Sequence, residues 1–308
     1  ISPIAGSPFI FHETTQLNNW CKPYRLHISG LDVIPDIDVE NDGKLCPQLD
    51  KWTMNSYQAL DGIKYAYAEY RPSLDGNKHP LVIWLHGLGE GGTDPSIDLL
   101  ANKVTAMADV PFQKCMNHAY VLVPQCPTMW MDNGKGEYKC DTKDSIYTKS
   151  LFELIDSYVK ENRDIDVNRI YIGGCSNGGY MTMEMLLHYP HYFAAAFPIC
   201  EAYHDEYITD DQIHMIKHIP LWFTYAKTDK VIDYTICTIP TVKRLVNAGA
   251  NNVHVSVFDD VHDTTGLYKN EDGSAYTYNG HCSWTYWYNN ECYDDELNAW
   301  EWLAQQGN

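Results

Sequence analysis

The sequence lacks several features that define large classes of proteins. Its 308 residues contain no apolar run near the ~18 residues that a membrane-spanning helix needs, so membrane insertion is not expected. Basic residues are scarce, with 22 Lys and Arg against 41 Asp and Glu and a net charge of −19. Such a surface repels phosphate backbones, which excludes nucleic acid as a partner. The absence of a repeat of about 20–50 residues argues against a solenoid or propeller.

The ten cysteines include no Cys-x-x-Cys pair, the spacing typical of a structural zinc site. Neither a metal nor an organic cofactor is expected. Cysteines in this number favour an oxidising compartment. The chain also begins with Ile1 rather than methionine, as a mature product does after removal of an export signal. We therefore expect a secreted protein.

The chain divides into an irregular part and a regular part. Residues 1–60 are rich in Pro, Asn and Asp, and we expect them to form an irregular extension packed on the core. Residues 61–308 are expected to form one α/β domain. Continuous apolar runs at 80–85 and 119–124 are typical of strands covered on both faces, and 169–173 is predicted as a third buried strand.

Strands and helices are predicted to alternate along this domain. The further strands are predicted at 63–70, 193–199, 220–225 and 253–258, and the helices at 151–159, 181–187, 242–248 and 295–305. This alternation indicates an α/β fold with a mainly parallel central sheet and helices on both faces. Open sheets of this kind place their chemistry at the carboxyl ends of the strands.

A Gly-x-Ser-x-Gly motif stands at residues 174–178, between the third buried run and the next helix. In this strand–turn–helix context the motif predicts that Ser176 is a nucleophile. Such a turn strains the serine backbone, and Gly174 and Gly178 must lack side chains to avoid a collision. The Ser176 hydroxyl is expected at the helix N-terminus, where the dipole favours a developing anion.

A serine that attacks a carbonyl needs amide donors for the oxygen that becomes negative. The residue after the nucleophile supplies one donor, so the Asn177 N–H is predicted for this role. The glycine-rich loop at 86–92 follows an earlier buried run. The Leu88 N–H in this loop is our choice for the second donor of the oxyanion hole.

The general base is expected to be a late histidine, oriented by a carboxylate that precedes it in the chain. Asp229 and Asp233 both follow the strand at 220–225, and Asp229 is preferred because it lies closer to the strand end. His262 and His281 both follow the last strand. His262 has the shorter loop, whereas His281 follows a glycine and opens an aromatic segment. His281 is preferred as the base, with His262 as the alternative.

Two cysteines adjoin the predicted catalytic residues, since Cys175 precedes Ser176 and Cys282 follows His281. Because the serine and histidine side chains meet in a working triad, their neighbours can also be close. A Cys175–Cys282 disulfide is one interpretation. A Cys175–Cys200 disulfide and a free buried Cys175 thiol are the alternatives, and geometry decides between them.

The sequence resembles a group of secreted α/β-hydrolases that includes polyhydroxybutyrate depolymerases, feruloyl esterases and prolyl-oligopeptidase-like hydrolases. The similarity runs from about Tyr65 to Gln305, and its markers are the segments 86–90, 174–179, 198–200, 228–231 and 280–284. In this group a Gly-His pair before a nearby Trp carries the base, which implies His281. The Cys-Ser and His-Cys adjacencies also resemble tannases and fungal feruloyl esterases, where a disulfide joins the two cysteines.

The catalytic residues predict an acyl-transfer hydrolase, and the resemblance implies a serine carboxylesterase. Feruloyl or acetyl esters of plant polysaccharides, or polyesters, are the expected small or polymeric substrates. Trp130 and Trp284 are expected to line the substrate site, where their rings could stack on a sugar or a phenol. A serine peptidase of the prolyl-oligopeptidase-like group and a catalytically silent carbohydrate-binding homologue are the alternatives.

Overall fold

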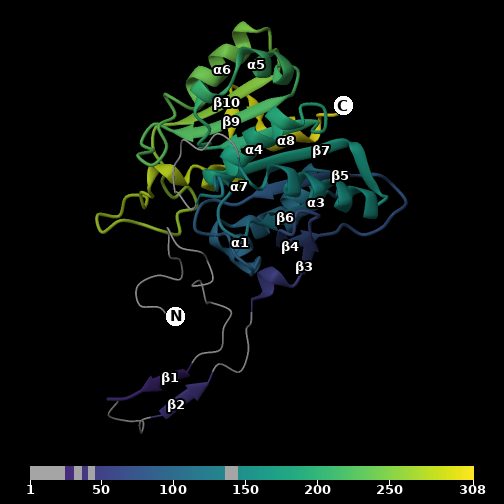
Figure 1. Cartoon of the computed structure of the whole chain (residues 1–308). Coiled ribbons are helices and arrows are strands. Elements are labelled where there is room, and N and C mark those ends of the chain that lie inside the picture. The colour runs from purple at the N-terminus through teal and green to yellow at the C-terminus, as the bar shows by residue number, and fades with distance from the viewer. Residues whose placement is uncertain (1–24, 31–36, 41–45, 136–144) are drawn as a thin grey trace.

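The structure, a computed structural model, describes residues 25–30, 37–40, 46–135 and 145–308. Its centre is an eight-stranded sheet with helices on both faces (Figure 1). In spatial order the strands are β10 (Val253–Phe258), β9 (Leu221–Ala226), β8 (Ala195–Ile199), β7 (Ile165–Cys175), β5 (His79–Leu85), β6 (Tyr120–Gln125), β4 (Lys64–Tyr70) and β3 (Thr53–Gln58).

Strands β5 to β10 run parallel to one another. At one edge β4 pairs antiparallel with β6, and β3 pairs antiparallel with β4. Every residue of β5, β6, β8 and β9 is buried. Strands that are apolar on both faces are expected where helices cover the sheet on both sides. The structure therefore confirms the predicted α/β fold with its mainly parallel sheet.

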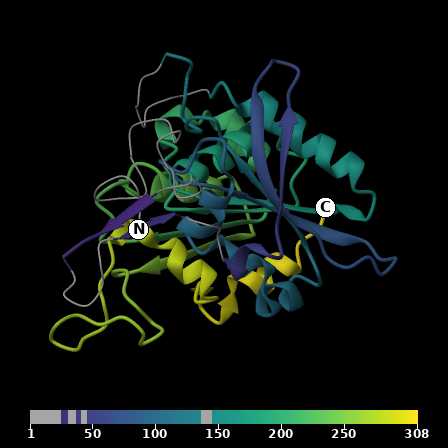
Figure 2. The same cartoon turned by 90° about the horizontal axis from the view of Figure 1, so that it is seen from below.

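Two helical layers cover the sheet. One face carries α3 (Thr148–Glu161), α4 (Asn177–His188), α5 (Asp210–Ile216) and α6 (Thr238–Asn247), and the other carries α1 (Ser96–Ala101), α2 (Val110–Cys115), α7 (Trp284–Tyr288) and α8 (Ala299–Ala304). Figure 2 shows the yellow C-terminal helices on the opposite side of the sheet from the teal helices. Across the described ranges, no helix combines the length and the apolar character that crossing a membrane requires.

The main sheet begins earlier in the chain than the composition indicated. Strand β3 falls within the predicted extension at 1–60, yet it pairs with β4 in the main sheet, so the sheet begins upstream of residue 61. Most β3 side chains are exposed or polar, which is why no hydrophobic pattern marked it. β1 (Arg25–Ile28) and β2 (Ile37–Glu40) form a separate hairpin, away from the sheet in Figure 1. Of residues 1–45, the structure describes only 25–30 and 37–40.

The last helix is shorter than the predicted range 295–305. Helix α8 begins at Ala299 because the Asn298 side chain accepts hydrogen bonds from the first backbone N–H groups of the helix. The residues before it form a short hairpin, β11 (Tyr293–Asp294) with β12 (Leu297–Asn298).

Candidate active site

Ser176 lies between the end of β7 and the first residue of α4, in the turn that the motif predicted. Its backbone has φ 56° and ψ −115°, a conformation that persists only when the surroundings enforce it. The Ser176 N–H donates a hydrogen bond to the Ile199 carbonyl oxygen at 2.9 Å. The strained turn is thereby fixed to the neighbouring strand β8.

The glycines beside the serine are required by the closeness of β5. A Cβ at Gly178 would lie 1.9 Å from the Leu85 carbonyl oxygen, and a Cβ at Gly174 would lie 2.4 Å from the same oxygen. Both distances are far below van der Waals contact. The prediction that these residues must lack side chains is confirmed, and the obstacle is the backbone of β5.

Replacing Gly178 by alanine is expected to destabilise the fold by about 3 kcal/mol, because a rigid strand backbone opposes the new methyl group. Gly307→Ala is the matched control, since its Cβ would lie at an ordinary 3.6 Å from the Asn168 carbonyl oxygen. Its free energy of unfolding should change by less than about 0.5 kcal/mol. Urea unfolding of both variants measures this difference, and equal stabilities would contradict the steric account.

Asp229 and His281 form a buried pair. The Asp229 Oδ2 atom lies 2.8 Å from His281 Nδ1, and the two side chains are 2% and 12% exposed. The other carboxylate oxygen accepts hydrogen bonds from the Val231 and Ile232 N–H groups at 2.8 and 3.0 Å. The carboxylate is thus held by its own loop and directed at the imidazole.

Gly280 allows the histidine loop to approach the acid loop. A Cβ at Gly280 would lie 2.3 Å from the Thr228 carbonyl carbon, so only glycine fits between the two loops. The Asn279 side chain accepts a hydrogen bond from the His281 N–H at 3.0 Å and fixes the short turn that carries the imidazole. Burial lowers the pKa of His281, but the Cys200 sulfur and the Asp229 carboxylate raise it, and their attraction dominates.

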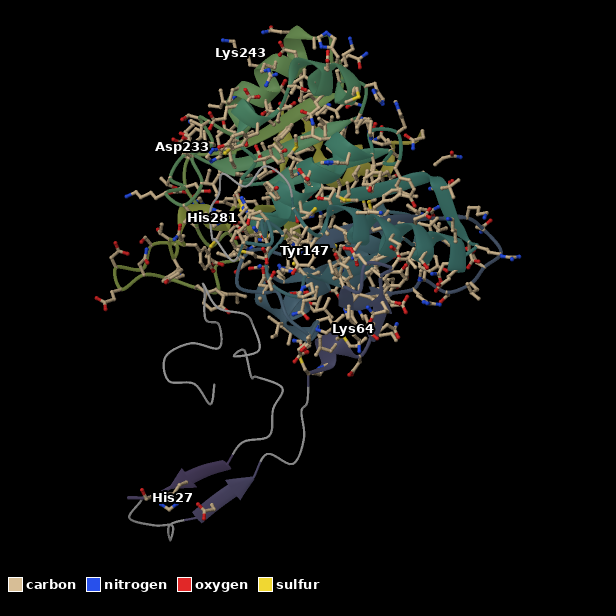
Figure 3. All side chains as sticks on the ribbon, in the orientation of Figure 1. His27, Lys64, Tyr147, Asp233, Lys243 and His281 are labelled. Carbon is tan, nitrogen blue, oxygen red and sulfur yellow. The ribbon has the colours of Figure 1, made fainter. Side chains whose placement is uncertain are left out.

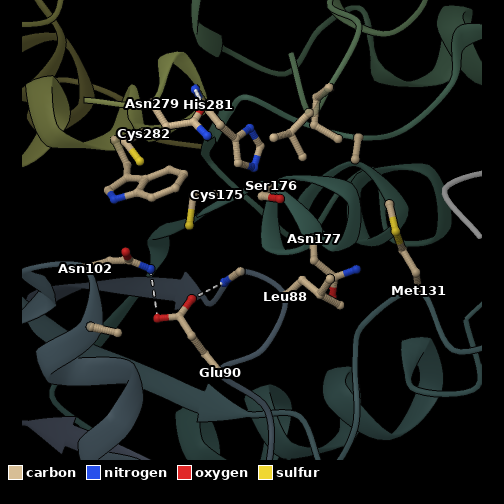
Figure 4. A pocket seen from close by; sticks show the side chains of 16 residues that line it. Leu88, Glu90, Asn102, Met131, Cys175, Ser176, Asn177, Asn279, His281 and Cys282 are labelled. Carbon is tan, nitrogen blue, oxygen red and sulfur yellow. Dashed lines mark hydrogen bonds between the residues drawn. The ribbon is translucent and has the colours of Figure 1, made fainter. Parts of the chain in front are cut away.

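Ser176 and His281 line one cavity of about 540 Å³. Figure 4 shows the His281 ring facing the Ser176 hydroxyl across this cavity. Leu88 and Asn177, the predicted oxyanion-hole residues, line the same cavity (Figure 4). Trp284 also lines it. The structure therefore brings together the side chains that the sequence analysis placed in the nucleophile, base and oxyanion roles.

The alternative acid and base lie elsewhere. Asp233 is exposed at the surface (Figure 3), and its carboxylate accepts hydrogen bonds from Thr235 in its own turn. The His262 side chain is 44% exposed, and its Nδ1 lies 2.7 Å from Asp260 Oδ1. Neither residue lines the cavity of Ser176.

Glu90 is a pocket residue to which the sequence analysis assigned no role. Its carboxylate is buried and accepts hydrogen bonds from the Gly87 N–H at 2.7 Å and from Asn102 Nδ2 at 2.8 Å. Figure 4 shows both contacts. Burial raises the pKa of Glu90 to about 8, although the Gly87 N–H opposes the rise. Glu90 thus fixes the loop that carries Leu88 through its hydrogen bond to the Gly87 N–H. Its position in the Gly-rich segment 86–92 is the sequence feature that could have predicted this role.

Glu90 should make the stability of the protein pH-dependent. The unfolded pKa of a glutamate is about 4.3, and the folded pKa is about 8, so the folded state keeps a proton that the unfolded state releases. Wild-type stability should therefore fall by up to about 1.4 kcal/mol per pH unit between these values, relative to Glu90→Gln. Chemical unfolding of both proteins at pH 5, 6 and 7 measures this difference. A difference that does not grow with pH would contradict the assignment.

The two tryptophans differ in position. Trp284 lines the cavity, and its ring lies edge-on to His281 with centroids 5.5 Å apart. Trp130 is fully buried, does not line the cavity, and its ring lies against Tyr65 and His86. The prediction that Trp130 faces the substrate is wrong, because its backbone N–H donates to Asn177 Oδ1 at 2.6 Å while its ring turns into the core.

Cys175, Cys200 and Cys282 are free thiols in the structure. The predicted disulfide, whether Cys175–Cys282 or Cys175–Cys200, is therefore not present in the structure. The Cys175 thiol points toward the loop of Glu90 (Figure 4), 3.5 Å from where a Cβ on Gly87 would be.

Three side chains beside Ser176 could hold a metal ion. Cys200, Asp229 and His281 each present one ligand atom, and these atoms all lie within 4.8 Å of one another. Cys200 was predicted only as a possible disulfide partner, because nothing local in the sequence places it beside the histidine.

Comparison with known proteins identifies the family of this chain. The phospholipase/carboxylesterase family model matches residues 73–266, which contain strands β5 to β10. Poly(3-hydroxyalkanoate) depolymerase C of Paucimonas lemoignei is 30% identical over 128 residues, which make up 39% of this chain and 27% of the depolymerase. This chain therefore matches only about a quarter of that relative's length.

Two solved structures extend the comparison. A thermostable esterase is 27% identical, with a TM-score of 0.68 over 89% of this chain and 68% of the esterase. A ferulic acid esterase is 14% identical, with a TM-score of 0.54 over 69% of this chain and 91% of that one, a likeness of fold alone. These matches confirm the resemblance to α/β-hydrolases that the sequence motifs indicated. Because the family model covers more than half of the chain, the protein belongs to the phospholipase/carboxylesterase family of α/β-hydrolases.

Proposed function

We propose that the protein is a serine carboxylesterase that works through an acyl-enzyme. The observation that carries the proposal is the Asp229–His281 pair, which faces Ser176 across one cavity. A buried carboxylate, an imidazole and a hydroxyl on a strained turn form the constellation of nucleophilic-serine hydrolases. Membership in the family supports hydrolysis of an ester.

In the proposed reaction, Ser176 Oγ attacks the ester carbonyl carbon while its proton passes to the free nitrogen of His281. Asp229 holds the imidazole in the required tautomer and stabilises its positive charge. The imidazolium then gives the proton to the leaving alcohol. Water, activated by the same imidazole, releases the carboxylic acid and restores the serine.

The negative oxygen of the tetrahedral intermediate needs preorganised donors. We assign this role to the N–H groups of Leu88 and Asn177, which lie on the wall beside Ser176. Glu90 supports the assignment because it fixes the neighbouring Gly87 N–H. The N-terminus of α4 adds a positive dipole at the same place.

The cavity supports an acyl donor of small-molecule size. Its volume of about 540 Å³ falls within the usual range for ligand sites, roughly 300–1,000 Å³. The side chains of Leu88, Met131, Ile232 and Trp284 make its lining mainly apolar. We propose that it accepts feruloyl-type or acetyl esters of plant polysaccharides, or an end of a polyester chain such as the substrate named for the depolymerase relative.

A panel of substrates tests this function. Hydrolysis rates are measured on p-nitrophenyl acetate, a methyl hydroxycinnamate, a poly(3-hydroxyalkanoate) film and an amide matched to the best ester. The proposal predicts turnover of at least one ester and much slower turnover of the amide. Faster amide cleavage would indicate a peptidase, and binding without turnover a silent homologue. An extracellular location remains a prediction, which cell fractionation with an antibody tests.

Asp229→Asn is expected to lower kcat/KM for an ester by about 10⁴-fold, because the amide favours the wrong imidazole tautomer. Asp233→Asn is the matched control and should change kcat/KM by less than about threefold, since Asp233 bonds only within its own turn among the described residues. Steady-state kinetics of both variants measure the effect. Comparable losses in the two would remove Asp229 from the proposed role.

A further inference from the structure

Cys200 has no part in the proposed reaction, yet it lies beside the proposed base. It directly follows β8, the strand between β7, which leads to Ser176, and β9, which leads to Asp229. The Cys200 N–H donates to the Thr224 carbonyl oxygen at 2.7 Å, and its backbone has a φ of 38°. The sheet thereby fixes a thiol, only 2% exposed, between the nucleophile and the acid.

The three side chains lie close enough together to bind one ion. Bonds of about 2.0–2.3 Å from Zn²⁺ to nitrogen, oxygen and sulfur place the ligand atoms about 3.3–3.6 Å apart. The candidate atoms of Cys200, Asp229 and His281 already lie within 4.8 Å of one another. Because the Asp229 and Cys200 side chains are almost completely buried, water competes weakly for them. Small side-chain shifts are sufficient to bring the three atoms onto one ion.

We propose that Cys200, Asp229 and His281 form an inhibitory binding site for a thiophilic divalent cation such as Zn²⁺. The thiol loses its proton to solvent, and sulfur, one imidazole nitrogen and one carboxylate oxygen bind the ion. Three protein ligands leave the fourth position for water. While the ion is bound, His281 loses its carboxylate partner and cannot serve as the base.

The donor set also determines which cations bind. Thiolate and imidazole favour Zn²⁺, whereas Mg²⁺ and Ca²⁺ require oxygen ligands in larger number. The site should therefore discriminate strongly against Mg²⁺. Inhibition rests on the proposed function, but binding of the cation does not.

The test measures binding without turnover. The full chain carrying Ser176→Ala, which lacks the proposed nucleophile, is titrated with Zn²⁺ by calorimetry and with Co²⁺ by absorption. We expect one equivalent to bind, with a thiolate-to-cobalt charge-transfer band, and no binding of Mg²⁺. Absence of Zn²⁺ binding, or of the charge-transfer band, would overturn the proposal whatever the enzyme's substrate is.

Matched cysteine variants identify the ligand. Cys200→Ser should weaken Zn²⁺ binding at least tenfold and abolish the charge-transfer band, since even outer-shell losses typically cost about 10–100-fold. Cys282→Ser, which changes a cavity cysteine outside the group, should bind Zn²⁺ like its parent. Equal affinity in the two variants would overturn the proposal. If Cys200→Ser does not fold, Asp229→Asn replaces it in the test and should weaken Zn²⁺ binding by a similar factor. Unchanged Zn²⁺ affinity in Asp229→Asn would also overturn the proposal.

Inhibition is tested separately on the chain with Ser176 intact. Micromolar Zn²⁺ should abolish ester hydrolysis, and a chelator should restore it. Cys200→Ser should need at least tenfold more Zn²⁺ for half inhibition of its own uninhibited rate. Binding without inhibition would overturn the inhibitory role while leaving the ligands assigned.

Discussion

Ser176→Ala is expected to lower kcat for ester hydrolysis by about 10⁶-fold, because loss of the nucleophile in a serine triad costs about as much as loss of the whole triad. The residual rate comes from the oxyanion donors and from substrate binding, which the substitution leaves in place. The hydroxyl is one atom on a cavity wall, and the turn that carries it is held by backbone contacts to β5 and β8. Folding should therefore be preserved.

Burst and steady-state assays with a p-nitrophenyl ester measure this loss, with thermal unfolding as the control for structure. The variant should show the melting temperature of the wild type within a few degrees and no burst of p-nitrophenol. Retention of more than about 1% of wild-type turnover in a folded variant would exclude Ser176 as the nucleophile.

His281→Ala should lower kcat by a similar factor, about 10⁵-fold to 10⁶-fold, because the serine then has no base. His262→Ala should change kcat less than tenfold. The two histidines follow the same last strand, and each has an aspartate oxygen within 2.8 Å of Nδ1. The two variants therefore test whether the position of the histidine, and not its aspartate partner alone, determines activity. Only His281 faces the cavity.

The comparison of these two variants discriminates between the alternatives that the sequence left open. Kinetics on the same ester, with circular dichroism as the folding control, provide the measurement. A larger loss in His262→Ala than in His281→Ala would mean that the loop around 262 closes over the site and supplies the base.

The turn that carries Ser176 could be predicted from the sequence because its signal is local. The strand, the strained turn and the helix are contiguous, and the glycines at 174 and 178 are forced by the backbone of β5. The preference for Asp229 over Asp233 also rested on a local feature, the distance of each residue from the strand end. In the structure the Asp229 carboxylate contacts His281, whereas the Asp233 carboxylate bonds to Thr235 in its own turn.

Other features depend on packing between segments that are distant in sequence. Trp130 follows a strand end, as catalytic residues do, but nothing local showed that its ring would turn into the core. Cys200 reaches His281 only through the order of β7, β8 and β9 in the sheet. A disulfide was expected from adjacency to Ser176 and His281, yet adjacency in sequence does not fix the direction of a thiol.

Covalent labelling tests the central assignment most directly. The full chain is treated with a fluorophosphonate and the modified residue is located by peptide mass spectrometry. The account predicts one adduct per chain, on Ser176, with labelling lost in Ser176→Ala and strongly slowed in His281→Ala. An adduct on another residue, or no adduct on a folded protein, would contradict it.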